Sequence, residues 1–300
     1  LCLLCSFLGS SLKSFDSSFF RTGNLEAAAL DPQQQLMLEV GYAAFHVSGR
    51  QQSTLHGSDT GTFLGMMNSD AAGLISGTFG AYTLTGIGYS SAAARLSFVF
   101  AMKGPAMSFD TACSSAPIAT HASSRTLERN DCSVGIGLGV TVMLLPGGAH
   151  TGPAVGGMLS TFGRCHTWDS KANGYLRAEA CCAVVLSRSG ESDLSQLIIC
   201  GSAAKHNGQS ATFTALNGSS QQMLLSAALS DAGSNSTERH MLETHGTGTS
   251  LGDPIEAGAV SDQACVGRCG LRALSLVGVK ANLGHTESAT GLAGLTKTML

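Results

Sequence analysis

Cys113 is the residue of this sequence best placed to act as a nucleophile. The segment 107–117 has the pattern of a strand, a tight turn of small residues and a helix whose first turn tolerates Pro117. Cys113 would then lie near a helix N-terminus, where free N–H groups and aligned peptide dipoles favour a thiolate and lower the thiol pKa from its usual ~8.5. Cysteines in Ala- and Ser-rich segments are also common as buried packing residues, so this neighbourhood alone leaves both interpretations open.

A second candidate is His245, which begins a loop rich in Gly and Thr. The apolar segment 240–243 before it predicts a strand that delivers the histidine to its end. Asp253 and Glu256 follow, and their spacing resembles a capping pair for the next helix. The glycines also suggest a nucleotide loop, but their spacing is G-x-G-x-x-x-G, and no acidic residue follows at the distance that a dinucleotide site needs.

A third group, Lys280, Asn282 and His285, occupies six positions after another apolar segment. The order is again strand, loop and helix. Each of the three residues alone would be ordinary in a polar loop. Two histidines at strand ends, together with a cysteine at a helix start, favour one shared site over three unrelated loops.

The elements expected around these residues alternate between strands and helices. Asp31 and Pro32 predict the start of a helix, because apolar residues follow at helical spacing. Between 132 and 144 apolar residues alternate with glycines, which predicts a strand with one nearly bare face that another element packs closely. Short buried strands are also expected at 183–186, 197–200, 240–243 and 274–279, and helices at 220–232 and 288–300. This alternation favours an α/β fold, and the turn-rich stretch 187–193 is the best place to divide the chain.

The composition argues against two classes of protein. With a formal net charge of -3 and no long run of Lys or Arg, the 300-residue chain lacks the basic surface that nucleic-acid binding needs. No apolar stretch reaches the ~18 residues of a membrane span. Only 12% of the residues are charged and 38 are Gly, which indicates a layered enzyme whose backbones approach closely.

The ten cysteines do not predict a disulfide framework, because their spacing is irregular and their density is low for a small secreted fold. A reducing compartment is therefore expected. The pairs Cys2–Cys5 and Cys265–Cys269 suggest zinc, but neither has further ligands at finger-like distance, so no metal site is predicted. The apolar residues 1–12 lack the basic start of a signal sequence, and we expect them to be a cut end.

Taken together, the three segments resemble the signatures of the ketosynthase (β-ketoacyl synthase) family of type I polyketide and fatty acid synthases. The matching residues are Asp110-Thr111-Ala112-Cys113-Ser114-Ser115, His245-Gly246-Thr247-Gly248-Thr249 and Lys280-x-Asn282-x-Gly284-His285, in the family's order and spacing. The similarity extends over essentially all 300 residues. Three long motifs in the right order are far more specific than any single glycine-rich loop.

The resemblance implies a thiolase-like α/β fold of two similar layered halves, usually in a homodimer. The halves would be 1–190, which carries Cys113, and 191–300, which carries both histidines and is incomplete. Cys113 would accept an acyl chain from the phosphopantetheine arm of an acyl carrier protein. His245 and His285 would donate hydrogen bonds to the carbonyl oxygen of a malonyl-type thioester as CO₂ leaves, and the enolate would attack the Cys113 thioester.

The resemblance also implies supporting roles for other residues. Lys280 would tune the histidines electrostatically. Thr247 and Thr249 would hold the pantetheine arm, and Asn282 would belong to the same substrate-binding group. Glu287 would also belong to the substrate-binding group and would support Lys280 or His285. No metal or redox cofactor is implied, and substrates would arrive on the carrier protein.

Some features depart from the family pattern. Ala178 and Ala180 replace glycines, and either would cost ~1 kcal/mol if its φ were positive. Residues 205–208 also differ from the usual Asn-Gln-Asp-Gly. Family members begin earlier and continue to a loop that supplies an oxyanion-hole donor, so truncation at both ends is expected. Losing one such donor costs ~10²-fold in rate, which makes an inactive fragment one alternative.

Another alternative is a transacylating ketosynthase-like domain that loads acyl chains without extending them, although such domains usually lack Cys113 or one histidine. A thiolase would have a second cysteine, and a ketosynthase III an asparagine, where this sequence has His285. The motifs do not determine the length of the acyl chain, the extender unit or the neighbouring domains. They also do not determine whether the pathway makes polyketides or fatty acids. The expected location is intracellular, in the cytoplasm, or in an organelle if a leader precedes the sequence.

Overall fold

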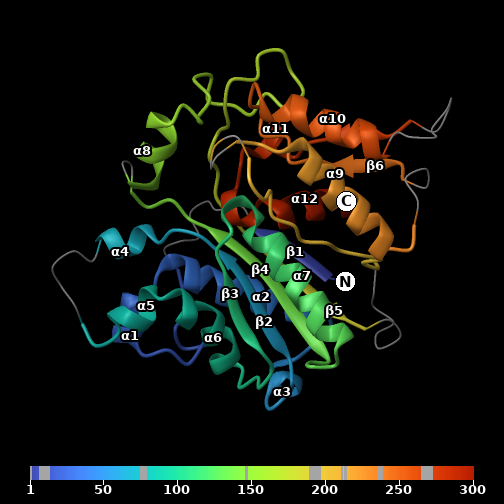
Figure 1. Cartoon of the computed structure of the whole chain (residues 1–300). Helices are drawn as coiled ribbons and strands as arrows, with labels where there is room; N and C mark the ends of the chain where they lie inside the picture. Colours follow the sequence, from blue (N-terminus) through green and yellow to red (C-terminus); the bar gives the residue numbers. More distant parts are fainter. Residues whose placement is uncertain are drawn as a thin grey trace. The chain divides into compact units, whose positions relative to one another are not determined.

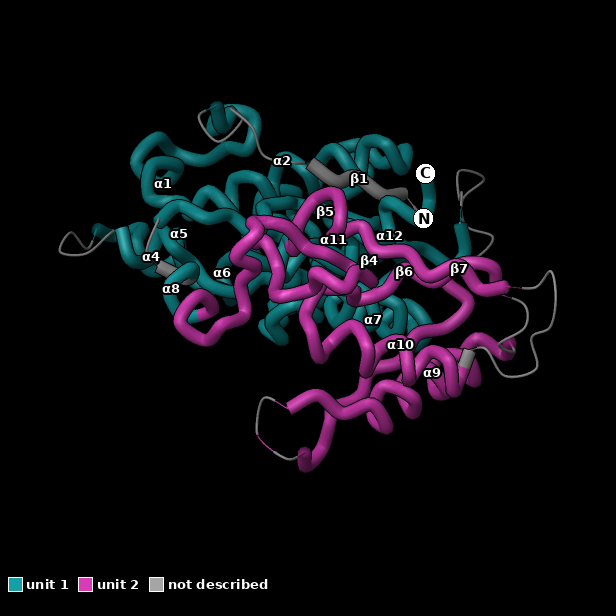
Figure 2. The backbone as a smooth tube through the Cα atoms, turned by 90° about the horizontal axis from the view of Figure 1, so that it is seen from above, with its two compact units in different colours: residues 1–152, 178–198, 286–300 teal, residues 153–177, 199–285 magenta. Residues whose placement is uncertain are grey.

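The computed structural model describes residues 2–6, 14–74, 80–145, 148–188, 197–210, 212, 215–234, 239–264 and 273–300. The chain divides into two compact units (Figure 2). The first comprises residues 1–152, 178–198 and 286–300, and the second comprises 153–177 and 199–285. The pair Cys265–Cys269 and much of the stretch 187–193 lie outside the described residues. Within the described part, no helix combines the length and the apolar character needed to cross a bilayer.

A five-stranded sheet forms the centre of the first unit (Figure 1). Its strands, in the spatial order β1-β5-β4-β2-β3, are β1 (Cys2–Ser6), β2 (Gly61–Met66), β3 (Ala106–Phe109), β4 (Val134–Thr141) and β5 (Ala180–Ser187). β2 pairs in parallel with β3 and β4, whereas β5 runs antiparallel to β4 and β1. Because β2, β3 and β4 are parallel, the segments that follow them emerge at the same end of the sheet. The segment that carries Cys113 is one of these.

The predicted alternation in β4 is confirmed, and its two faces pack against different helices. Its apolar side chains join the buried core together with residues of α2 (Pro32–Val47). Its glycines face α7 (Ser115–Glu128): a Cβ added to Gly139 would lie 2.6 Å from the Ala116 Cβ. The helix therefore rests almost directly on the strand backbone. This is the close packing that the bare face of the strand predicted.

Helix α2 begins where the sequence predicts it. The Asp31 carboxylate accepts a hydrogen bond from the Gln33 N–H at 2.8 Å, and Pro32 occupies the first turn. Leu36, Val40 and Ala44 are all at most 5% exposed. The helical spacing of these residues therefore marked the face that packs on the sheet.

Shorter helices complete the first unit. They are α1 (Asn24–Ala29), α3 (Gln52–Leu55), α4 (Asp70–Leu74), α5 (Thr83–Ile87) and α6 (Tyr89–Val99), with η4 (Glu287–Ala289) and α12 (Thr290–Met299) at the end of the chain. The last two confirm the helix predicted at 288–300. Helix α6 has no predicted counterpart, because small residues dominate its first half and hide its period. Neither Ala178 nor Ala180 is among the described residues with a positive φ, so these substitutions introduce no strain of that kind.

The second unit contains a two-stranded parallel sheet, β6 (Met241–Glu243) with β7 (Ser275–Val277). Helices α9 (Gly218–Asp231) and α10 (Gly252–Ala264) pack against each other, and α11 (Lys280–Leu283) follows β7. Helix α8 (Gly148–Val155) lies in the sequence where the first unit gives way to the second. These elements confirm the predicted strands at 240–243 and 274–279 and the predicted helix at 220–232.

The strand predicted at 197–200 is wrong. These residues form no strand, and Leu197 and Ile198 are 40% and 71% exposed. The segment lies where the chain passes from the first unit into the second. Its apolar residues have no period, and composition alone does not distinguish a short buried strand from an extended connection.

Candidate active site

Cys113 lies in a tight bend between β3 and α7, as the sequence predicts. The bend is a short 3₁₀ turn, η2 (Ala112–Ser114), and the thiol-bearing residue is half-buried. The Ser115 hydroxyl fastens this bend, because it donates to the Ala112 carbonyl at 2.7 Å and accepts the Thr111 N–H at 2.9 Å. Cys113 is thereby held at the N-terminus of α7, where the helix dipole favours a thiolate.

The bend is strained, and it depends on a glycine in the strand beneath it. Ala112 has a φ of 53°, a left-handed conformation that costs ~1 kcal/mol or more for a residue with a side chain. A Cβ added to Gly65 of β2 would lie 2.3 Å from the Ala116 nitrogen in the first turn of α7. Since only glycine allows this approach, the sheet sets the position at which Cys113 is presented.

His245 follows the carboxyl end of β6 and begins a loop that two carboxylates of α10 hold in place. Glu256 accepts the N–H groups of His245 and Gly246 at 2.6 and 2.8 Å, and Asp253 accepts that of Gly248 at 3.0 Å. The prediction that Asp253 and Glu256 form a capping pair for their own helix is therefore wrong. The two carboxylates instead accept hydrogen bonds from backbone N–H groups of the loop that precedes α10.

His285 and Lys280 join His245 in one cluster of the second unit. The two imidazole centroids are 5.8 Å apart, and their planes lie at 89°. Lys280, which is 3% exposed, donates a hydrogen bond from Nζ to the His245 carbonyl at 2.5 Å. The second unit thus brings together three of the four residues predicted to be catalytic, whereas Cys113 belongs to the first unit.

The surroundings of both histidines favour the neutral imidazole. Burial lowers the pKa of His285 well below its ordinary value, and the charges of Lys280, His245 and Arg177 lower it further. Desolvation by burial and the Lys280 charge lower the pKa of His245 to about 4. His245 nevertheless keeps an exposed surface, whereas His285 is 1% exposed. Water at the exposed surface of His245 would stabilise its imidazolium and so oppose the lowering of its pKa. We therefore base the expected pH dependence of catalysis on His285.

The other predicted site residues occupy different settings. Thr247 is buried in the His245 loop, and its hydroxyl lies 3.2 Å from that of Thr249. Asn282 is exposed on α11. Glu287 is 5% exposed in η4 with a φ of 44°, and it belongs to the first unit.

Three residues that position the site are not predicted to do so by the sequence. Ser115 enters only as part of a motif, and Asp253 and Glu256 are expected in a helix cap. The sequence does contain a pattern that could have indicated the role of Asp253 and Glu256. A Gly-rich loop has several N–H groups that need hydrogen-bond acceptors, and a carboxylate that follows soon after the loop can accept them.

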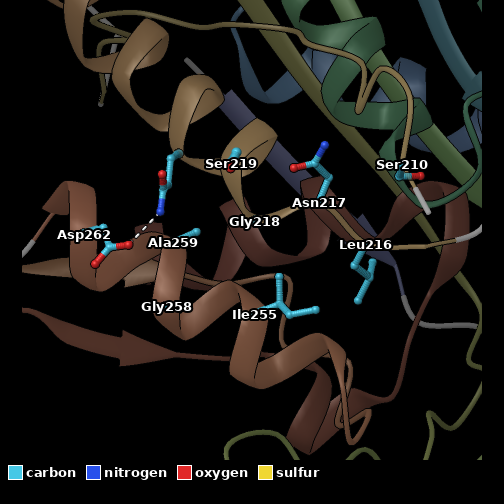
Figure 3. A pocket seen from close by; sticks show the side chains of 10 residues that line it. Ser210, Leu216, Asn217, Gly218, Ser219, Ile255, Gly258, Ala259 and Asp262 are labelled. Atoms are coloured by element: carbon cyan, nitrogen blue, oxygen red, sulfur yellow. Dashed lines mark hydrogen bonds between the residues drawn. The ribbon is translucent and has the colours of Figure 1, made fainter.

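A surface hollow of about 550 Å³ lies between α9 and α10 (Figure 3). Gln222 of α9 donates a hydrogen bond across it to Asp262 of α10 at 2.7 Å. None of the eight predicted site residues lines this hollow. It is therefore separate from the histidine cluster.

Two sequence families together match nearly the whole chain. The family described as "Beta-ketoacyl synthase, N-terminal domain" matches residues 6–192, and "Beta-ketoacyl synthase, C-terminal domain" matches residues 197–300. The chain is 38% identical over 293 residues to the polyketide synthase GfsA of Streptomyces halstedii, covering 95% of this chain and 4% of that protein. It is also 38% identical over 310 residues to the non-reducing polyketide synthase olcA of Penicillium canescens, covering 98% and 13%. The chain thus spans only a small part of these relatives.

Solved structures agree with the sequence matches. The ketosynthase from module 6 of the bacillaene synthase of Bacillus subtilis 168 superposes with a TM-score of 0.89 at 32% identity, covering 97% of this chain and 52% of that chain. An oxazolomycin ketosynthase domain of Streptomyces albus JA3453 gives a TM-score of 0.88 at 34% identity, covering 97% and 53%. The predicted α/β, thiolase-like fold class is confirmed by these neighbours. The chain therefore belongs to the β-ketoacyl synthase family, in the group of ketosynthase domains of polyketide synthases.

Proposed function

We propose that the chain catalyses decarboxylative condensation in polyketide synthesis, with Cys113 as nucleophile and His245 and His285 as hydrogen-bond donors. The observation that carries this proposal is the pairing of two imidazoles, 5.8 Å apart, beside the buried Lys280. Two neutral donors beside a cation suit a carbonyl oxygen that gains negative charge. The position of Cys113 at a helix N-terminus supports the other half of the reaction.

The proposed reaction has two stages. In the first, the Cys113 thiolate attacks the acyl thioester on a carrier protein, and the pantetheine thiol leaves. In the second, the C–C bond between the α-carbon and the carboxylate of a malonyl-type thioester breaks, and CO₂ departs. The electron pair of that bond forms an enolate, whose oxygen the histidines stabilise. The enolate carbon attacks the acyl carbonyl, and the Cys113 thiolate leaves. A β-ketoacyl chain is then attached to the carrier protein.

Supporting roles follow from the same proposal. Thr247 and Thr249 would bind the pantetheine arm, because their hydroxyls lie side by side in the His245 loop. Asn282 would contribute to substrate binding from the exposed surface of α11, and Glu287 would support the site electrostatically. We assign residues 1–190 and 191–300 to two halves of one ketosynthase, in keeping with the two family matches.

The proposed function is tested by comparing the amount of CO₂ released with the amount of β-ketoacyl product formed. The protein is incubated with acyl-carrier protein, in a series from acetyl to hexanoyl, and with malonyl- or methylmalonyl-carrier protein carrying a labelled carboxylate. Condensation is expected to release one labelled CO₂ for each β-ketoacyl product. A transacylating domain would instead exchange acyl groups without forming this product, and that result would contradict the proposal.

Replacing Lys280 by Met is expected to make catalysis sensitive to acid. Because the Lys280 charge lowers the pKa of both histidines, its removal raises those values, and imidazolium forms at a higher pH. Since the donors act as neutral imidazoles, CO₂ release should then fall as the pH drops from 9 to 5, over a range in which the parent rate is level. The measurement is the pH–rate profile of malonyl-thioester decarboxylation. Lys280→Arg keeps the charge and serves as the control, and an unchanged profile for Lys280→Met would contradict the electrostatic role.

A homodimer is the proposed assembly, with β3 at its interface. In the described part of the chain β3 is an edge strand, which leaves backbone groups open to pairing. Met107 on β3 is 43% exposed, and Phe98 on the neighbouring α6 is 80% exposed. Combining Met107→Lys with Phe98→Asp is expected to raise the dimer dissociation constant at least ~10-fold in sedimentation experiments. Leu25→Asp, at an equally exposed apolar site on α1, is the control, and an unaffected dimer in the double variant would place the interface elsewhere.

A further inference from the structure

The His285 backbone is fixed by a neighbouring segment of the second unit. Its N–H donates to the Leu176 carbonyl at 2.7 Å, and a parallel bridge pairs His285 with Arg177. This anchoring fixes the Cα position. It does not fix the ring, because rotation of a histidine about χ2 is broad and roughly two-fold. An imidazole that donates to a developing oxyanion needs a defined ring orientation as well.

The ring of Tyr175 contacts the His285 imidazole and can fix its orientation. The Tyr175 and His285 ring centroids are 5.0 Å apart, with planes tilted by 54°. The His245 ring, itself a proposed donor, also contacts His285. An aromatic ring at this distance restricts the imidazole through a broad, rigid contact, which a flexible aliphatic side chain would not reproduce.

The backbone that carries Tyr175 is itself rigid. Its N–H donates to the Met158 carbonyl, and its own carbonyl accepts the Ser160 N–H, both at 3.0 Å. Gly174 before it has a φ of 146°, and an added Cβ would lie 2.5 Å from the Leu159 carbonyl carbon. On the other side, the Leu176 N–H donates to the Cys165 sulfur at 3.2 Å. The tyrosine ring therefore extends from a backbone that is fixed both before and after it.

We propose that Tyr175 is a positioning residue for His285: its ring holds the imidazole in the orientation that stabilises the enolate oxygen. This inference rests on the proposed condensing function. The ring itself is the acting group, so phenylalanine at this position should serve as well as tyrosine. A misplacement of about 1 Å can cost up to ~10²-fold in rate, and an unsupported donor should show a loss toward that size.

The test measures CO₂ release from malonyl-pantetheine by the parent and by three variants, Tyr175→Phe, Tyr175→Leu and Tyr175→Met. Tyr175→Leu is expected to lower kcat at least ~10-fold and to leave KM within ~2-fold, whereas Tyr175→Phe should stay within ~2-fold of the parent. Acyl loading of Cys113 should be unchanged in all of them. Tyr175→Met repeats the aliphatic substitution with a more adaptable side chain, in case the leucine variant does not fold.

A double variant separates action through His285 from a general structural effect. In a His285→Ala background, adding Tyr175→Leu should cause no further loss, because the residue that Tyr175 positions is already absent. An equal loss in both backgrounds, or an equal loss with phenylalanine, would overturn the inference. If His285→Ala alone decarboxylated at the parent rate, the failure would lie with the proposed function, and the role of Tyr175 would fall with it.

The NMR signal of His285 provides a measurement on the parent protein itself. In protein labelled with ¹³C-histidine, the His285 ring signal is assigned from its loss in His285→Ala. It should show a ring-current shift that Tyr175→Phe retains and Tyr175→Leu or Tyr175→Met removes. A His285 signal that does not respond to loss of the aromatic ring would overturn the inference, even if the rates changed.

Discussion

Cys113→Ala is expected to lower the condensation rate by at least ~10³-fold, because the acyl chain then has no covalent attachment site. The tight bend at η2 and the close contact of α7 with Gly65 hold this residue, so alanine should leave the fold intact. Decarboxylation of the malonyl thioester should persist, since that step needs only the histidine donors. The two activities are measured separately, as β-ketoacyl product and as labelled CO₂.

Cys200→Ala is the matched control for this experiment. Cys200 is an exposed cysteine, so its loss removes an accessible thiol without touching the bend that holds Cys113. Condensation by this variant should match the parent. If Cys113→Ala still condensed acyl groups at the parent rate, another residue would have to be the nucleophile.

His285→Ala is expected to lower both CO₂ release and condensation by ~10²-fold or more. This is the typical cost of removing one oxyanion donor, and His285 is a buried imidazole whose lowered pKa favours the neutral form that this task needs. Acyl loading of Cys113 should continue, because that step precedes the enolate. Single-turnover loading, followed by mass spectrometry, distinguishes the two steps.

His150→Ala is the control for general effects of losing a histidine, since His150 is exposed on α8. It should match the parent in all three measurements. A loss of loading equal to the loss of CO₂ release in His285→Ala would indicate that His285 acts in acyl transfer, and the assigned donor role would be wrong.

Much of the first unit could be predicted from the sequence because its patterns are local. The alternation of apolar residues and glycines in β4 depends only on the period of a strand, and the Asp31 cap depends only on neighbouring residues. Helix α6 and the exposed segment 197–200 were not predicted correctly. In both, the deciding factor is which surface the segment packs against, and a short apolar or small-residue run does not encode that.

The sequence indicates which residues the candidate site contains, but it says less about the residues that hold them in position. The motifs point to Cys113, His245 and His285, but they do not show that Glu256 holds the His245 loop. Tyr175 precedes His285 by more than a hundred positions, and a parallel bridge brings their segments together. Contacts of this kind depend on the tertiary fold, so local spacing carries no signal for them.

The most direct test of the account is to follow the acyl group itself. The protein is loaded with labelled acyl-carrier protein, and peptide mapping by mass spectrometry locates the label before and after malonyl-carrier protein is added. The proposed mechanism requires a thioester on Cys113 that disappears as CO₂ and β-ketoacyl product form in equal amounts. Label on another residue, or a Cys113 thioester that persists while product accumulates, would contradict it.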